Sequence, residues 1–203
     1  MRTLRKSLQD FSFFEREKVR EKIVSNKCGR DFLYYALNFY FPEEFNKTSN
    51  NPVKIDRLKL FGSPVHSSFA WTQIQFANVA NFFNQKSLKL FINNREVEGY
   101  FSFIYATLFA RKECDDAIEE IKRAIDGNEV VGIDISLGMS GLLDHVLFVY
   151  GYDEDNLYVF DTHRVSRLEY VPIEGSNFYY QLPKSVISSR WTKFGRVWSV
   201  KKF

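Results

Sequence analysis

Residues 144–161 read DHVLFVYGYDEDNLYVFD, and this stretch decides the fold. Both halves are rich in β-branched and aromatic residues, which favours a strand at 145–152 and a second at 157–160. The residues between them, Asp153-Glu154-Asp155-Asn156, have the composition of a hairpin turn. The stretch therefore predicts two neighbouring antiparallel strands.

The predicted hairpin brings an imidazole and a carboxylate to the same end of the sheet. Pairing about the turn places His145, which opens the first strand, near Phe160 or Asp161, at the end of the second. Cross-strand neighbours lie close enough for their side chains to interact. We therefore expect His145 and Asp161 to be within hydrogen-bonding distance.

The rest of the chain changes from helical to extended character along its length. Apolar spacing predicts helices first and strands afterwards, an order typical of an α+β fold with an antiparallel sheet and not of alternating βαβ units. We expect helices at 13–24, 28–40, 69–85, 100–110 and 115–125, a short strand at 88–92, and strands at 130–136, 168–171 and 196–201.

Composition excludes several classes of protein. The 203 residues are 45% hydrophobic and 26% charged, as in a single domain with one core, which excludes intrinsic disorder, collagen-like repeats and a whole-chain coiled coil. A net charge of +3 does not by itself predict a nucleic-acid partner. No apolar run is long enough to span a membrane, and the N-terminus lacks a secretory signal pattern, so we expect a cytoplasmic protein.

The two cysteines stand in different surroundings. Two cysteines make no disulfide framework. Cys114 lies among acidic residues that oppose thiolate formation, and we interpret it as incidental. Cys28 begins a predicted helix, where the positive end of the helix dipole favours the thiolate, and Gly29 beside it leaves room for a substrate carbonyl.

Cys28, His145 and Asp161 together form a candidate catalytic triad. A lone cysteine or histidine is more often structural. In combination, a thiolate nucleophile, a histidine general base and an acid that orients the histidine are what acyl transfer through a thioester requires. The joint pattern therefore points to chemistry that neither residue indicates alone.

Three segments carry a resemblance to a known family. NKCGRDFLYYAL at 26–37 resembles the cysteine block of papain-like peptidases of the C39, bacteriocin-processing type. DHVLFVYGYD at 144–153 and LYVFD at 157–161 are similar to the histidine block and acid strand of that family, with His145 and Asp161 separated as expected there. The resemblance covers about 35 residues.

The resemblance implies a papain-like fold in which N-terminal helices, with the nucleophile helix among them, pack on a C-terminal antiparallel sheet. It implies Cys28 as nucleophile, His145 as base and Asp161 as the orienting acid. The whole chain, 1–203, is then one papain-like domain, and the stretch at about 43–128 is an insertion with no assigned role.

One position departs from the family pattern. The family usually has a glutamine about six residues before the cysteine, where its amide completes the oxyanion hole, and this chain has Lys22 there. Loss of one such donor typically costs about 10²–10³ in rate. Asn26 is the oxyanion candidate, with Gln73 and Gln75 as alternatives.

These features predict a cysteine hydrolase, most simply a peptidase, that acts on a peptide or protein. Two alternatives remain open: a catalytically silent papain-like module that binds a peptide or partner, and an acyltransferase or transglutaminase-like enzyme with the same triad. We expect no cofactor. We also expect no metal, because His66, His145 and His163 lack zinc-ligand spacing.

Overall fold

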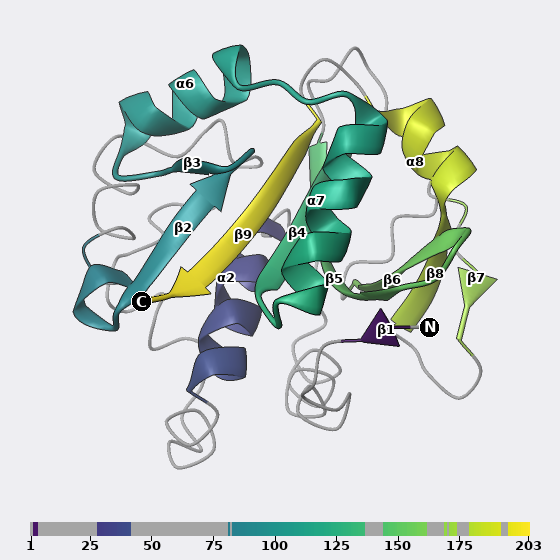
Figure 1. Cartoon of the computed structure of the whole chain (residues 1–203), viewed down its shortest axis with the longest axis horizontal. Helices are drawn as coiled ribbons and strands as arrows, with labels where there is room; N and C mark the ends of the chain where they lie inside the picture. Colours follow the sequence, from purple (N-terminus) through teal and green to yellow (C-terminus); the bar gives the residue numbers. More distant parts are fainter. Residues whose placement is uncertain are drawn as a thin grey trace.

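The chain folds as an α+β protein in which helices cover a large antiparallel sheet (Figure 1). The computed structural model describes residues 2–3, 28–41, 81, 83–136, 144–161, 169, 171–173, 179–191 and 195–203. Within them the helices are α2 (Cys28–Tyr40), α6 (Tyr100–Phe109), α7 (Cys114–Asp126) and α8 (Lys184–Arg190). The predicted α+β class with an antiparallel sheet is confirmed.

The sheet has the strand order β3-β2-β9-β4-β5-β6-β8-β7, and every pairing in it is antiparallel. The short strand β1 (Arg2–Thr3) pairs with the end of β5. The other strands are β2 (Leu88–Ile92), β3 (Arg95–Glu96), β4 (Val130–Ser136), β5 (Asp144–Tyr152), β6 (Asn156–Phe160), β7 (Val171–Pro172), β8 (Tyr179–Pro183) and β9 (Arg196–Lys202).

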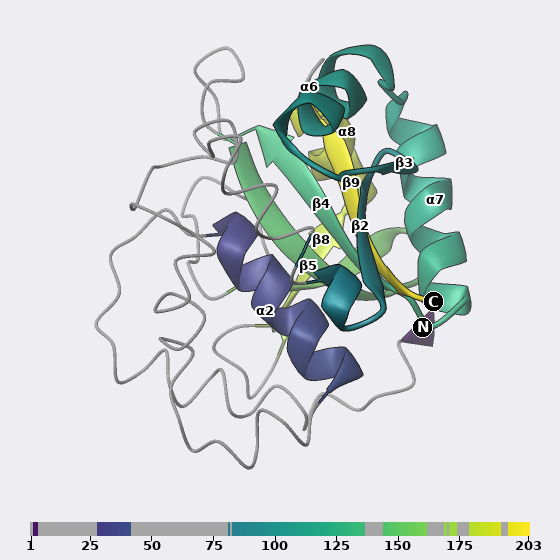
Figure 2. The ribbon, with the colours of Figure 1, turned by 90° about the vertical axis from the view of Figure 1, so that its left-hand side faces the viewer.

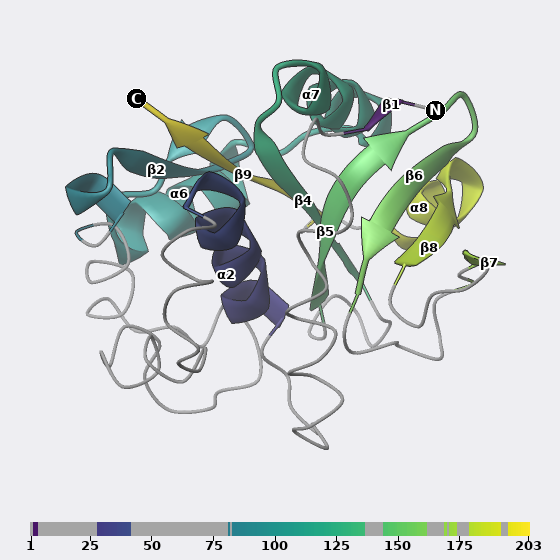
Figure 3. The same cartoon turned by 90° about the horizontal axis from the view of Figure 1, so that it is seen from below.

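Helices lie on both faces of the sheet: α2 on one and α7 on the other (Figures 2 and 3). The contact surface of α2 is aromatic. The ring of Phe32 lies 5.9 Å from that of Trp198, and the ring of Tyr35 lies 5.0 Å from that of Phe160, both edge to face. Such aromatic pairs stabilise beyond the area they bury. The abundance of phenylalanine and tyrosine is therefore explained in part by this layer.

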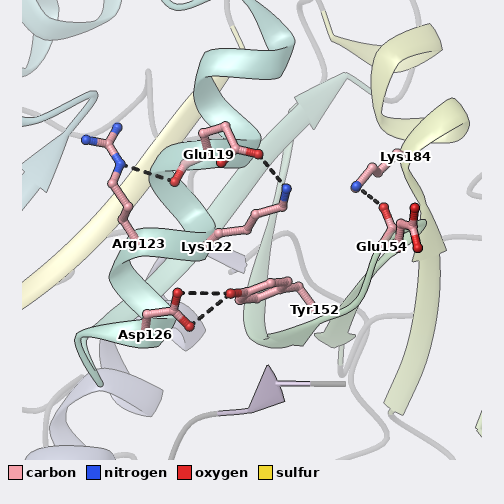
Figure 4. A network of polar contacts seen from close by, with 7 residues as sticks. All are labelled: Glu119, Lys122, Arg123, Asp126, Tyr152, Glu154 and Lys184. Atoms are coloured by element: carbon pink, nitrogen blue, oxygen red, sulfur yellow. Dashed lines mark hydrogen bonds and ion pairs between the residues drawn. The ribbon is translucent and has the colours of Figure 1, made fainter.

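The amphipathic helix α7 buries its apolar stripe on the opposite face, and its outer side carries charges. The hydroxyl of Tyr152 in β5 donates to both carboxylate oxygens of Asp126, at 2.9 and 3.0 Å (Figure 4). Lys122 pairs with Glu119 one turn away on the same helix. Exposed contacts of this kind contribute little stability, so apolar burial holds α7 in place.

The β5–β6 hairpin forms as predicted, although its register differs from the expectation. Asp153 Oδ1 accepts from the backbone N–H groups of Asp155 and Asn156, which closes the turn. A bulge lies between Val149 and Gly151. The turn aligns Tyr152 with Leu157, and beyond the bulge Phe148 pairs with Phe160. The predicted pairing of His145 with Phe160 or Asp161 is therefore wrong, because the turn and the bulge together fix which residues lie opposite one another.

Several elements were not predicted from the sequence. Ile92 and Arg95 pair across a two-residue turn in which Asn93 and Asn94 have positive φ, as such tight hairpins require. Strands β1 and β8 and helix α8 were also missed. The predicted helix at 13–24 lies outside the described residues, as does most of the helix at 69–85, of which residues 81 and 83–85 are helical.

Part of the segment with no assigned role forms one edge of the sheet and two of the helices. Residues 83–128 supply β2, β3, α6 and α7, and β2 pairs with β9 over its full length. The predicted strands at 88–92 and 130–136 have the predicted bounds. No helix in the described part of the chain is long and apolar enough to cross a membrane.

Candidate active site

Cys28, His145 and Asp161 come together from three separate elements. Cys28 is the first residue of α2, His145 is the second residue of β5, and Asp161 directly follows β6. The histidine and the aspartate are buried, with 5% and 3% of their surfaces exposed, whereas Cys28 is only partly buried. A partly accessible thiol next to a buried acid–base pair can meet a substrate while its partners stay shielded from water.

His145 and Asp161 form a direct ion pair. His145 Nε2 lies 2.9 Å from Asp161 Oδ2. Continuing the pairing of Phe148 with Phe160 by one residue places Asp161 across from Leu147, two residues along from His145. The contact is therefore a diagonal one between neighbouring strands, which long side chains can bridge. The expected contact forms although the expected register does not.

Cys28 completes a chain of hydrogen-bonded groups. Its side chain hydrogen-bonds to the His145 imidazole. Because Nε2 is occupied by Asp161, Nδ1 is the ring nitrogen that remains for the thiol. The order thiol, imidazole, carboxylate is the one in which a histidine takes a proton from sulfur while an acid holds the ring.

The electrostatics of the site favour a protonated histidine. Burial alone lowers the pKa of His145, but the Asp161 charge and hydrogen bond, with a smaller contribution from Cys28, outweigh it. The pKa of His145 is therefore raised well above its usual value of 6.5. An imidazolium at neutral pH is the partner that a thiolate requires.

Two contacts fix the position of α2, and with it Cys28. Gly132 in β4 lets the helix approach closely, because a Cβ there would lie 2.7 Å from both Phe32 Cε2 and the Leu147 carbonyl oxygen. At the far end of the helix, the Tyr40 hydroxyl donates to the Val200 carbonyl at 2.7 Å. Burial raises the pKa of Tyr40 to about 12, so this hydroxyl remains a donor at neutral pH.

The oxyanion candidate Asn26 and its alternatives Gln73 and Gln75 lie outside the described residues. The same is true of Lys22, His66 and His163. In the described part of the chain, no group of three or more His, Cys, Asp or Glu side chains is placed to hold a metal ion.

Sequence reasoning missed a buried ion pair in the sheet, between Asp134 in β4 and Arg196 in β9. Both are fully buried, and Arg196 Nη2 lies 2.5 Å from Asp134 Oδ2. A signal was present, since Asp134 is the one charged residue in the otherwise apolar strand VVGIDIS. A charge in a buried strand needs a partner, but its identity depends on the order of the strands.

Comparison with protein-family models, curated proteins and solved structures finds no match to this chain.

The raised pKa of His145 predicts how stability depends on pH. Because the folded-state pKa exceeds the unfolded value of about 6.5, the ion pair with Asp161 stabilises the fold fully below that value. This stabilisation is lost as the pH rises through the folded-state pKa. We expect the difference in unfolding free energy between wild type and Asp161→Asn to be largest near pH 6 and to shrink at higher pH.

Urea denaturation of both proteins, from about pH 6 to about pH 10, measures this difference. A difference that does not change with pH would mean that Asp161 stabilises the fold without pairing to a protonated histidine.

Proposed function

We propose that the protein is a papain-like cysteine hydrolase of the C39 type, and specifically a peptidase. The observation that carries the proposal is the hydrogen-bonded series Cys28, His145 and Asp161, in which the last two are buried 2.9 Å apart. The resemblance of the cysteine and histidine segments to that family supports it. Papain-like architecture is part of the proposal.

The first half of the reaction forms a thioester. The Cys28 sulfur attacks the carbonyl carbon of the scissile amide, and the negative charge moves to the carbonyl oxygen. The Cys28 backbone N–H is among the first N–H groups of α2, which have no partner within the helix, so it can donate to this oxygen. His145 then gives its proton to the leaving amine nitrogen as the carbon–nitrogen bond breaks.

The second half returns the enzyme to its starting state. Neutral His145 removes a proton from water, and the hydroxide oxygen attacks the thioester carbon. The carbon–sulfur bond breaks, which releases a carboxylic acid and the Cys28 thiolate beside a protonated His145. Asp161 stabilises the imidazolium and holds the ring in one orientation throughout.

The proposal predicts that the two cysteines differ in reactivity. At about pH 7, iodoacetamide should label Cys28 at least tenfold faster than Cys114, because a neighbouring imidazolium favours the thiolate. Burial, with smaller contributions from Asp115 and Glu113, raises the pKa of Cys114, although its contact with Ser188 acts the other way. Peptide mass spectrometry of briefly labelled protein measures both rates.

Equal labelling at the rate of a free thiol would exclude an activated nucleophile. Hydrolysis itself is tested by incubating wild type and Cys28→Ser with a mixture of peptides and identifying new termini. The serine variant is the matched control, since it keeps the shape of the side chain without the thiolate. Adding small amines to the same reaction tests the transferase alternative, because amide products would replace acids.

A second candidate function is a silent papain-like module that binds a peptide. The observation that favours it is Lys22 in the place of the expected oxyanion glutamine. In that case the peptide mixture stays intact, and peptides are retained equally by wild type and Cys28→Ser.

A further inference from the structure

Helix α6 has no charged side. It lies next to β3 at one end of the molecule (Figure 1), and its sequence, YFSFIYATLF, contains no charged residue. On its inner side Phe103 and Ala106 are fully buried, and the Phe103 ring lies 6.3 Å from that of Trp198. A helix that is apolar all round is normally covered on every side, so the outer side of α6 calls for an explanation.

The outer side of α6 is an aromatic stripe formed by Phe101, Tyr105 and Phe109. These side chains are 73%, 53% and 72% exposed. Because they are four residues apart, they follow one side of the helix over about 12 Å. The rings of Tyr105 and Phe109 lie 5.4 Å apart, and the Arg95 guanidinium lies 6.0 Å from the centroid of the Tyr105 ring. A contiguous exposed apolar surface is typical of a contact site for another molecule.

Opposite charges stand at the two ends of the aromatic stripe. Glu98 lies two residues before α6 and Arg111 two residues after it, and both are exposed. Ser102 Oγ accepts from the Glu98 backbone N–H at 2.9 Å, which fixes Glu98 at the start of the helix. Nearby Glu96 and Lys112 are engaged in ion pairs, whereas the Glu98 and Arg111 side chains form none within the described part of the chain. These two charges are therefore available to a partner.

The pattern is complementary to itself in one orientation. Phe101 and Phe109 lie four residues on either side of Tyr105. If two copies of α6 pack antiparallel about a two-fold axis at Tyr105, Phe101 of each copy meets Phe109 of the other. The same arrangement brings Glu98 of each copy to the helix end that Arg111 of the other follows, so opposite charges face each other. A parallel arrangement would bring like charges together.

We propose that the aromatic stripe is the contact surface of a symmetric dimer, in which α6 of a second copy of this chain covers it. The inference goes beyond the proposed function and does not depend on it. An aromatic side chain has a surface of about 200 Å², so the exposed fractions of the three residues amount to about 400 Å² per copy. This is about half the surface that each partner buries in a standard interface, so the dimer should be weak and reversible, with Kd in the micromolar range.

A lipid surface fits the same face less well. Helices that lie on membranes carry lysines and arginines around their apolar side, where anionic headgroups attract them. The exposed charges around α6 are of both signs, with Arg95 and Arg111 against Glu98 and Glu113. Such a mixture favours a protein surface that carries the same mixture, as a second copy does.

The test is sedimentation velocity of the full chain from about 2 µM to about 500 µM, across which the wild type should shift from monomer to dimer. Tyr105→Lys places a positive charge against its own copy at the axis. It should weaken association by about tenfold or more, and the unfolding temperature should not fall, because the side chain is exposed. Phe203→Lys is the matched control: it changes an aromatic residue of similar exposure, 69%, at the C-terminus away from α6, and should dimerise like the wild type (Figure 1).

Charge reversal tests the orientation. Glu98→Arg and Arg111→Glu should each weaken self-association, because like charges then face each other across the axis. An equal mixture of the two variants should recover the dimer, since every contact between the helix ends of a mixed pair joins opposite charges. Single reversals that leave association unchanged, or a mixture that recovers nothing, would overturn the antiparallel arrangement.

A wild type that stays monomeric up to about 500 µM overturns the dimer, as does a Tyr105→Lys protein that associates like the wild type. A monomeric wild type that floats with vesicles of phosphatidylcholine and phosphatidylglycerol would assign the aromatic stripe to a membrane surface instead.

Discussion

His145→Ala will slow the alkylation of Cys28 at about pH 7 by about tenfold or more. A neighbouring imidazolium favours the thiolate, which is the nucleophilic form of a cysteine. Removal of the imidazole therefore removes the charge that favours the thiolate. Peptide hydrolysis should fall further, by about 10²–10⁴, because the proton donor for the leaving amine is lost as well.

Asp161→Asn should act in the same direction through the histidine. The amide keeps the shape of the side chain and removes the charge that, with its hydrogen bond, raises the pKa of His145. We expect alkylation of Cys28 to slow by about tenfold. Peptide mass spectrometry after brief labelling at about pH 7 measures the rate in both variants.

Cys114 supplies the internal control for these measurements, because it lies away from the imidazole, in contact with Ser188, and its labelling rate should not change. Variants that unfold at lower temperature but label Cys28 at the wild-type rate would contradict the triad, and the binding module would then be the remaining function.

Gly132→Ala should destabilise the fold, because no space is left for a methyl group between β4 and α2. The new Cβ would meet the Leu147 carbonyl oxygen and the Phe32 ring at 2.7 Å, and neither can move freely. Phe32 is fully buried against Phe148 and Trp198, and Leu147 is paired with Ile133. Overpacking of this kind costs about 1–3 kcal/mol, which chemical denaturation can measure.

Gly132→Ala should also change the geometry of the candidate active site. Relief of the clash moves α2 away from the sheet, and Cys28 moves with it, so the hydrogen bond to His145 weakens and alkylation slows. Gly99→Ala is the matched control, since nothing lies within 4 Å of a Cβ at that position and its backbone is extended. A Gly132→Ala protein as stable as the Gly99→Ala protein would show that the packing of α2 on β4 is loose.

The sequence alone determined the elements whose signals are local. The helix at 28–40 and the strands at 88–92 and 130–136 have the predicted bounds, because helical and alternating apolar spacings differ within a few residues. His145 and Asp161 were also predicted together, since a single hairpin connects them. Their contact tolerates an error of register because a histidine can reach a diagonal neighbour.

The shortest elements were not predicted by the same reasoning. Strands β1 and β3 have two residues each, which is too short for an alternating pattern to repeat. The Asn93-Asn94 turn carried a usable signal in two consecutive residues that tolerate positive φ. It was missed because the strand after it is so short.

Only the tertiary structure decided which distant residues meet. The strand order places β4 between β9 and β5, and this order pairs Asp134 with Arg196. Likewise, Cys28 reaches His145 because α2 packs on the sheet through Phe32 and the space above Gly132. Local periodicity determines which face of a helix or strand is apolar. The element against which that face packs depends on how all elements fit together in the core, and no single segment of sequence contains that information.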